Sequence, residues 1–240
     1  MKTAIVSIDF DYFIREKTGW DWGHCETSLH LNQIWDIRYS TNSIDIKKET
    51  DPAIYADFMP DELKNKLAEK NLFLNDFTST ANAESHLAIL EFFKAIGYDC
   101  DLFINIDAHH DLFGGETHKT NGGFTCENWW FDVLAKNPTA KHIWIYPNWL
   151  SDKLSKAYMQ AMKLPKPVKS MTFSELNLSD DYSIKGLFFC RSGCWVPPHL
   201  DPLFNQMCCS FTSNLFMPER EYYIDQKLKA EVQKLREKCF

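Results

Sequence analysis

The sequence predicts an α/β fold with three layers, α/β/α, around a mainly parallel sheet. Short apolar, β-branched runs alternate with helical patterns along the chain, and this order is typical of parallel strands joined by helical crossovers. The chain has 240 residues and 45% hydrophobic content, enough for a substantial core. No internal repeat or low-complexity linker divides it, so we expect one domain over residues 1–240.

The first half of the chain opens with a buried strand over residues 3–8. An aromatic-rich insertion without clean periodicity follows over residues 14–60, and long excursions of this kind often line a binding site. A proline opens a short helix over residues 60–70. A longer helix is expected over residues 82–96, because apolar residues recur there at helical spacing and Gly97 follows as a stop.

The second half continues the alternation. A buried strand over residues 101–106 leads into a glycine-rich loop at 112–126. The remaining expected strands cover residues 143–146, 168–173 and 184–189, and the remaining helices cover residues 127–136, 151–162, 201–212 and 221–238.

Composition narrows the class of protein. The net charge of −7 disfavours binding to a phosphate backbone, so no nucleic-acid partner is expected; it suits a soluble protein, and it is compatible with a cationic substrate. No apolar run is long enough for a signal peptide or a bilayer span, which predicts a cytoplasmic protein with no membrane partner. The eight cysteines form no CxxC pair, and Cys190 and Cys194 lack a second pair at zinc-ligand spacing.

Metal-ligand residue types follow two of the expected strands. In open α/β sheets, sites form beyond the carboxyl ends of strands. Residues at positions i, i+2 and i+4 of extended chain point the same way, so the donors of an Asp-x-His-x-Asp run can converge. The strand at 101–106 runs into Asp107, His109, His110 and Asp111, and the strand at 3–8 runs into Asp9 and Asp11.

Four buried carboxylates at one sheet edge would repel one another and lose hydration, and divalent cations remove both difficulties. A carboxylate-rich set that includes imidazole suits Mn²⁺, with Fe²⁺, Co²⁺ or Zn²⁺ as other occupants. His86 has polar neighbours and stands before the strand at 101–106, so it is the candidate for a sixth ligand. Asp-x-Asp after a strand is also common in ordinary loops, whereas the Asp107–Asp111 run is much more specific.

At these residues the sequence resembles the ureohydrolases, the arginase and agmatinase superfamily. Their Asp-Ala-His-x-Asp motif is matched from Asp107 to Asp111, their upstream histidine by His86, and their Ser-x-Asp-x-Asp motif by residues 7–11. In common arginases the last of these motifs comes late in the chain, whereas here it comes first. The sequence is most similar to the peptide arginases of ribosomal-peptide maturation, in the early Ser-Ile-Asp-Phe-Asp-Tyr-Phe run, residues 126–129 and residues 190–201.

The resemblance implies a three-layer arginase/deacetylase-like fold and a binuclear centre with two Mn²⁺ ions. Asp9 and Asp107 would bridge the ions, and the remaining ligands would be His86 with Asp111 on one ion and His109 with Asp11 on the other. A metal-activated water would attack the guanidinium carbon of peptidyl arginine, releasing urea and leaving ornithine. The implied partner is an arginine-containing precursor peptide, and a homo-oligomer stays open.

Proton transfer and substrate binding are less defined by the sequence. His118 or His110 could protonate the leaving amine, although His118 also fits an exposed loop histidine and His110 a packing role. Glu127 beside Asn128 could pair with the guanidinium, although a glutamate in a first helical turn also favours the helix dipole. Arg191 could fix a substrate carbonyl or carboxylate, and a structural ion pair explains it equally well.

Three other functions fit the same residues. A ureohydrolase of free arginine or agmatine would share the metal motifs. A zinc deacetylase of the related fold has an Asp-x-His-His run too, but it binds one ion, and its residue at the position of Asp111 is usually glycine. A non-catalytic binding protein could have kept the ligands and use residues 14–60 as its interaction surface.

Overall fold

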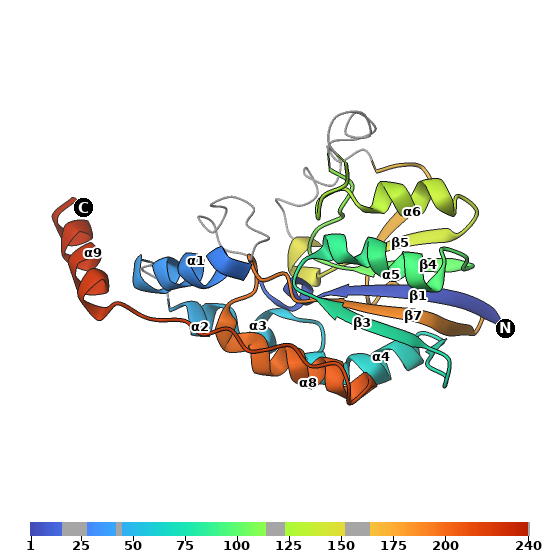
Figure 1. The fold of residues 1–240 in the computed structure, drawn as a ribbon, viewed down its shortest axis with the longest axis horizontal. Helices are drawn as coiled ribbons and strands as arrows, with labels where there is room; N and C mark the ends of the chain where they lie inside the picture. Colours follow the sequence, from blue (N-terminus) through green and yellow to red (C-terminus); the bar gives the residue numbers. More distant parts are fainter. Residues whose placement is uncertain (16–27, 42–44, 114–122, 152–163, 240) are drawn as a thin grey trace.

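The protein is an α/β structure built on a mainly parallel sheet with helices on both faces (Figure 1). The computed structural model describes residues 1–15, 28–41, 45–113, 123–151 and 164–239. Within these residues the sheet has the strand order β2-β7-β1-β4-β5-β6, and β3 also pairs with β7. Every pairing is parallel. The predicted fold class is therefore confirmed.

The strands lie where apolar runs predict them, with two additions. The bounds are β1 Lys2–Asp9, β2 Leu72–Phe73, β3 Ser79–Ala83, β4 Leu102–Ile106, β5 Lys141–Tyr146, β6 Val168–Thr172 and β7 Tyr182–Cys190. Neither β2 nor β3 was expected from the sequence. β2 has only two residues, and β3 consists of small or polar residues that are half-buried. Both pair with the same edge of β7, one after the other.

Side chains alternate between the two faces of the sheet, as extended backbone requires. On β1, Val6 and Ile8 join the hydrophobic cluster packed against α4 (Leu63–Glu69) and α8 (Asp201–Phe211). Ile5 points to the other face and joins the cluster packed against α5 (Ile89–Ile96) and α6 (Trp130–Lys136). Figure 1 shows these two helix pairs on opposite sides of the strands.

The helix expected over residues 82–96 is wrong in its first part. Residues 79–83 form β3 instead, because their backbone pairs with β7. The helical chain begins only where the Ser85 side chain accepts a hydrogen bond from the Leu87 N–H. The short 3-10 helix η3 (His86–Ala88) then runs directly into α5. This later start places His86 at the carboxyl edge of the sheet.

Residues 14–60 were expected to be irregular, and that is wrong for much of the described part. This stretch contains α1 (Ser28–Thr41), α2 (Ile46–Glu49) and α3 (Pro52–Tyr55). Helix α1 lacks a clean apolar stripe because it buries the polar residues Arg38 and Ser40 as well as Trp35 and Tyr39. A hydrophobic period therefore does not reveal this helix.

Smaller differences concern helix bounds. The 3-10 helix η2 (Pro60–Glu62) precedes α4, α6 starts three residues later than expected, and α9 (Gln226–Cys239) starts five residues later. Ser151 is the last residue of η5 (Asn148–Ser151). The rest of the helix expected over residues 151–162 lies outside the described residues. No helix in the described ranges is both long and apolar enough to cross a membrane.

Candidate metal centre

The alternation along β1 and β4 places polar side chains at one end of one sheet face. Ser7 and Asp9 follow Ile5 on the α5/α6 side, and Asn105 and Asp107 take the matching positions after Phe103. All four polar residues are almost fully buried, at 0–3% exposure. A face that starts apolar and ends in buried amide, hydroxyl and carboxylate groups is therefore a candidate site.

The turn after β1 brings a second carboxylate into the same place. Asp9 caps the 3-10 helix η1 (Phe10–Phe13) by accepting a hydrogen bond of 3.2 Å from the Asp11 N–H. Asp11 Oδ1 accepts the Ala108 N–H at 3.3 Å, and Asp11 Oδ2 lies 2.8 Å from His109 Nδ1. The β1 and β4 ends are thus joined through Asp11.

The turn after β4 folds back tightly on itself. The His109 N–H donates to Asp107 Oδ1 at 2.7 Å. Asp111 has a φ of 50°, in the left-handed region that costs a residue other than glycine about 1–2 kcal/mol and that aspartate tolerates better than most. This conformation turns the Asp111 carboxylate toward His86, and backbone strain of this kind gathers at functional sites.

His86 lies at the centre of the cluster. Its Nε2 is 2.6 Å from the Ser7 hydroxyl, which fixes the ring. Its Nδ1 lies 3.2 Å from Asp9 Oδ2, 3.2 Å from Asp107 Oδ2 and 2.9 Å from Asp111 Oδ2. Among the described residues, Nδ1 is nevertheless a buried atom without a partner in hydrogen-bonding geometry. One nitrogen facing three carboxylate oxygens needs a positive charge among them, so the arrangement fits a bound cation.

The donors form overlapping sets whose ligand atoms lie within 4.8 Å of one another. The first set is Asp11, Asp107 and His109, and the second is His86, Asp107 and Asp111. Asp107 belongs to both, and Asp9 is joined to the second by its contact with His86. The structure therefore brings all six sequence-predicted ligands together, in a cluster that could hold a metal ion.

Burial and mutual repulsion perturb these acids. Burial, followed by the charges of Asp111 and Asp9, raises the pKa of Asp107 to about 7. Burial and the charges of Asp9 and Asp107 raise the pKa of Asp11 well above its ordinary value, and burial also raises the pKa of Asp111. Burial opposes ionisation of Asp9 too, but the adjacent His86 and the hydrogen bonds from Ser192 and the Asp11 N–H outweigh it and lower the pKa of Asp9. Protons or cations must therefore balance the cluster.

Hydrogen-bond donors around the cluster hold the carboxylates in place. Trp129 Nε1 donates to Asp111 Oδ2 at 2.5 Å, the Ser192 hydroxyl donates to Asp9 Oδ2 at 2.6 Å, and Asn105 Nδ2 donates to Asp107 Oδ2 at 3.0 Å. None of these three residues was expected from the sequence to hydrogen-bond the carboxylates. Asn105 could have been found, because it stands two positions before a ligand on the same strand, whereas Trp129 and Ser192 give no such signal.

His110 lies beside the centre but is packed. Its ring stacks on Phe113 at 4.1 Å, and its Nδ1 accepts the Leu112 N–H at 3.0 Å. Burial, with the charge of His109, lowers the pKa of His110 to about 4. The ring is therefore neutral near pH 7 and contributes packing. His118, the other candidate for proton transfer, lies outside the described residues.

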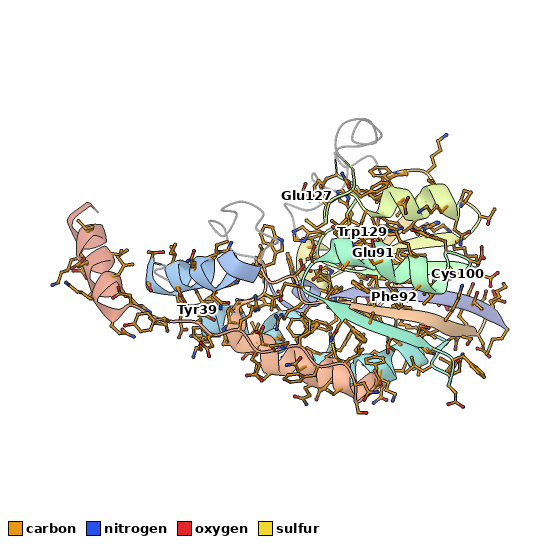
Figure 2. The ribbon with its side chains drawn as sticks, in the orientation of Figure 1. Tyr39, Glu91, Phe92, Cys100, Glu127 and Trp129 are labelled. Carbon is orange, nitrogen blue, oxygen red and sulfur yellow. The ribbon has the colours of Figure 1, made fainter. Side chains whose placement is uncertain are left out.

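The three candidate substrate residues take different places. Glu127 is half-buried in the turn before α6, two residues before Trp129 (Figure 2), and its carbonyl accepts the Phe113 N–H at 2.9 Å. Asn128 is buried, and its side chain accepts the Thr125 N–H at 2.8 Å, which stabilises that turn. The Arg191 guanidinium is bound to Glu84 and to the carbonyl of Pro218, as in the ion-pair alternative.

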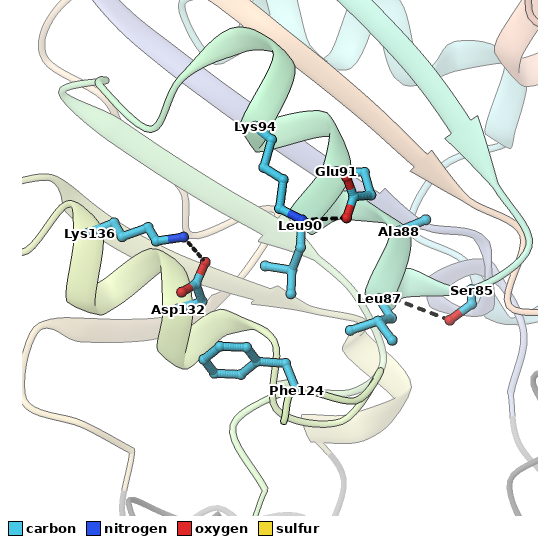
Figure 3. A pocket seen from close by; sticks show the side chains of 9 residues that line it. All are labelled: Ser85, Leu87, Ala88, Leu90, Glu91, Lys94, Phe124, Asp132 and Lys136. Atoms are coloured by element: carbon cyan, nitrogen blue, oxygen red, sulfur yellow. Dashed lines mark hydrogen bonds and ion pairs between the residues drawn. The ribbon is translucent and has the colours of Figure 1, made fainter. Parts of the chain in front are cut away.

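A cavity of about 610 Å³ lies next to the centre, along α5 and α6 (Figure 3). Leu87, Leu90 and Phe124 give it apolar walls, and the Lys94–Glu91 and Lys136–Asp132 ion pairs lie along it. Ser85 and Leu87, which flank His86, line it, but none of the six donors does. The cavity is therefore separate from the metal-donor cluster, which consists of Asp9, Asp11, His86, Asp107, His109 and Asp111.

Comparison with known proteins gives no relative: no family model, no curated protein and no solved structure matches this chain. The fold and the donor geometry are thus the basis for the function proposed below.

Proposed function

We propose that the protein is a two-metal hydrolase that cleaves the guanidinium of peptidyl arginine, releasing urea and leaving ornithine. The observation that carries the proposal is the pair of three-donor sets that share Asp107. A single-ion hydrolase needs three protein ligands, whereas six buried or half-buried donors converge here. A carboxylate common to two sets is the arrangement by which two neighbouring ions are held together.

The donor chemistry favours manganese. Four carboxylates and two imidazoles make up the six donors, and hard oxygen ligands with some imidazole suit Mn²⁺. Two such ions would supply Lewis acidity and a nucleophile at neutral pH. The chain itself holds the carboxylates through Trp129, Ser192 and Asn105, so the site needs little rearrangement when it is loaded.

The substrate would approach from the side of His109. The His109 side chain is 25% exposed, whereas those of His86 and the four aspartates are at most 7% exposed. Trp195 is half-buried beside it, with ring centroids 5.1 Å apart. An indole next to an acidic centre suits a planar guanidinium, because the cation can stack on the ring while it faces the carboxylates.

The experiment is incubation of the manganese-loaded protein with arginine, agmatine and an arginine-containing peptide, with urea measured in each. Urea from the peptide alone is expected. Urea from free arginine or agmatine would instead assign the small-molecule ureohydrolase activity. Absence of urea, with deacetylation of an acetyl-lysine peptide by protein that holds one zinc ion, would overturn the proposal in favour of a deacetylase.

Metal content gives an independent measurement. About two manganese ions per chain are expected after loading, and about one is expected for the deacetylase alternative. Asp111→Asn should lower the metal content and abolish urea release, because Asp111 belongs to the second donor set. Asp180→Asn makes the same chemical change in an exposed ion pair with Lys2 and should leave both unchanged.

A further inference from the structure

A sulfur atom lies against the metal-donor cluster. Cys190 is the last residue of β7 and the register partner of Asp9 on β1. One extra residue of β7 stands between the partners of Ala4 and Ile5, which shifts the register. Because a shift of one residue reverses the side-chain direction, this irregularity puts Cys190 on the same sheet face as Asp9. The side chain is fully buried there.

Cys190 completes a third donor set with Asp9 and His86, whose ligand atoms also lie within 4.8 Å of one another. A second observation points into the same place, because His86 Nδ1 is buried and has no hydrogen-bond partner in the described part of the chain. Within the described ranges, the sulfur makes two weak hydrogen bonds, to the Glu84 carbonyl at 3.7 Å and with the Ser192 hydroxyl at 3.6 Å. An ion held by this set would gain a strong bond to sulfur, and the thiol would give up only weak hydrogen bonds.

We propose that Cys190, Asp9 and His86 form an alternative site for a thiophilic divalent cation such as Zn²⁺, Co²⁺ or Cd²⁺. Soft thiolate ligands select such ions over Mn²⁺. On binding, the thiol proton passes to solvent and a metal–sulfur bond forms. The inference rests on the proposed metal centre, but it does not require urea chemistry.

An ion at the sulfur-containing set and the pair of manganese ions cannot be bound at the same time. Asp9 and His86 would serve the manganese pair, and the sulfur-containing set uses the same two side chains. An ion bound to Cys190 therefore withdraws two donors from the oxygen-rich arrangement. The expected consequence is that zinc displaces manganese and inhibits the hydrolase, and that loss of the sulfur removes this preference.

The test is a titration of the metal-free protein with Co²⁺, followed by absorption. Thiolate ligation gives an intense sulfur-to-cobalt charge-transfer band in the near ultraviolet, whereas oxygen and nitrogen ligands give only weak visible bands. The band is expected in the parent protein and in Cys194→Ser, a buried cysteine four positions later. It should be lost in Cys190→Ser, while the weak visible bands remain.

Other outcomes would overturn the inference. Visible bands without charge transfer in the parent protein would leave the metal centre in place and remove Cys190 from it. A band that survives in Cys190→Ser would assign the thiolate elsewhere, and failure of the parent to bind cobalt would contradict the metal centre itself. If Cys190→Ser does not fold, X-ray absorption of the zinc-loaded parent decides, because one sulfur scatterer in the metal shell is expected and none would contradict the proposal.

Discussion

Two groups of buried charge lie side by side at the carboxyl edge of the sheet, and they are built differently. The metal-donor cluster contains four aspartates and two histidines, and its acids face one another. The arginine network contains Glu84, Arg191, Asp201 and Arg220, two acids against two bases. In the network, Arg220 Nη2 lies 2.6 Å from Asp201 Oδ1, and Arg191 Nη1 lies 3.3 Å from Asp201 Oδ2.

This difference indicates a structural role for the arginine network and a functional role for the metal-donor cluster. In the arginine network each buried charge has an opposite charge from the chain, and Arg220 also donates to the carbonyls of Gly193 and Val196. That network fixes the loop after β7. In the metal-donor cluster the described residues supply too little positive charge, and the balance must come from protons or from ions. Loss of a charged group should therefore have opposite consequences in the two groups.

The largest expected effect is on activity, from a change in the metal-donor cluster. Asp107→Asn removes the carboxylate common to both donor sets and should lower urea release about a thousand-fold or more, since the Lewis acidity of bound ions is worth several kcal/mol. The fold should survive, because the variant also removes repulsion among buried acids. Urea assays and thermal unfolding of the metal-free protein measure the two effects. Full activity would contradict the role of Asp107.

The next largest effect is on stability, from a change in the arginine network. Arg191→Met should destabilise the protein by about 3–5 kcal/mol, because it leaves two acids, Glu84 and Asp201, against Arg220 alone, so that one negative charge is uncompensated. Chemical unfolding measures this loss. Lys94→Met is the matched control, because Lys94 forms an exposed pair with Glu91, and its loss should change stability by no more than about 1 kcal/mol. Equal effects of the two changes would remove the distinction drawn between the groups.

A smaller effect is expected from a change in the hydrogen-bond donors around the metal-donor cluster. Trp129→Phe keeps most of the buried ring but deletes the N–H that bonds Asp111 Oδ2. Metal affinity should fall about 10- to 100-fold, as is usual when a group that orients a ligand is lost. Calorimetric titration with Mn²⁺ gives the affinity. Trp130→Phe is the control, because the Trp130 N–H bonds His142 and not a ligand.

The last expected effect, the smallest when taken per pH unit, is a pH dependence of stability in the metal-free protein. The pKa of Asp107 is raised to about 7, so its stabilising contribution is present below its ordinary value of 3.8 and is lost as the pH rises through about 7. An asparagine at position 107 does not ionise, so its contribution to stability is not lost as the pH rises. The stability of Asp107→Asn relative to the parent should therefore rise between about pH 4 and pH 7, by at most about 1.4 kcal/mol per pH unit. A stability difference that does not change with pH would contradict the raised pKa of Asp107.

Much of the architecture could be predicted from the sequence, because apolar runs and their order define a parallel sheet. The six donors could be predicted for the same reason, since Asp9 and Asp107 end neighbouring strands. Of the supporting residues, Trp129 and Ser192 could not, because they reach the cluster from segments 18 and 183 positions away from the aspartates that they bind. Arg191 illustrates the same limit: its residue type fits substrate binding or an ion pair, and only its contacts decide.

The secondary-structure errors have one physical source. β3 and α1 lack the apolar periodicity of their type, because β3 lies half-buried at the sheet edge and α1 buries polar residues among its aromatic ones. Their stability comes from tertiary contacts, such as the bond from Trp35 Nε1 to the Gly193 carbonyl at 2.7 Å. Local patterns carry no trace of partners so distant in the chain.

The central place of β1 in the sheet has a consequence for biosynthesis. This strand is translated before its partners, yet one partner is β4 at residues 102–106 and the other is β7 at residues 182–190. At about 5–20 residues per second, roughly ten seconds or more separate the first strand from its last neighbour on the ribosome. During that interval the edge of β1 that pairs with β7 has no partner strand. All six donors lie at or before residue 111, so the donor set is translated before β7 and before Ser192, whose hydroxyl bonds Asp9.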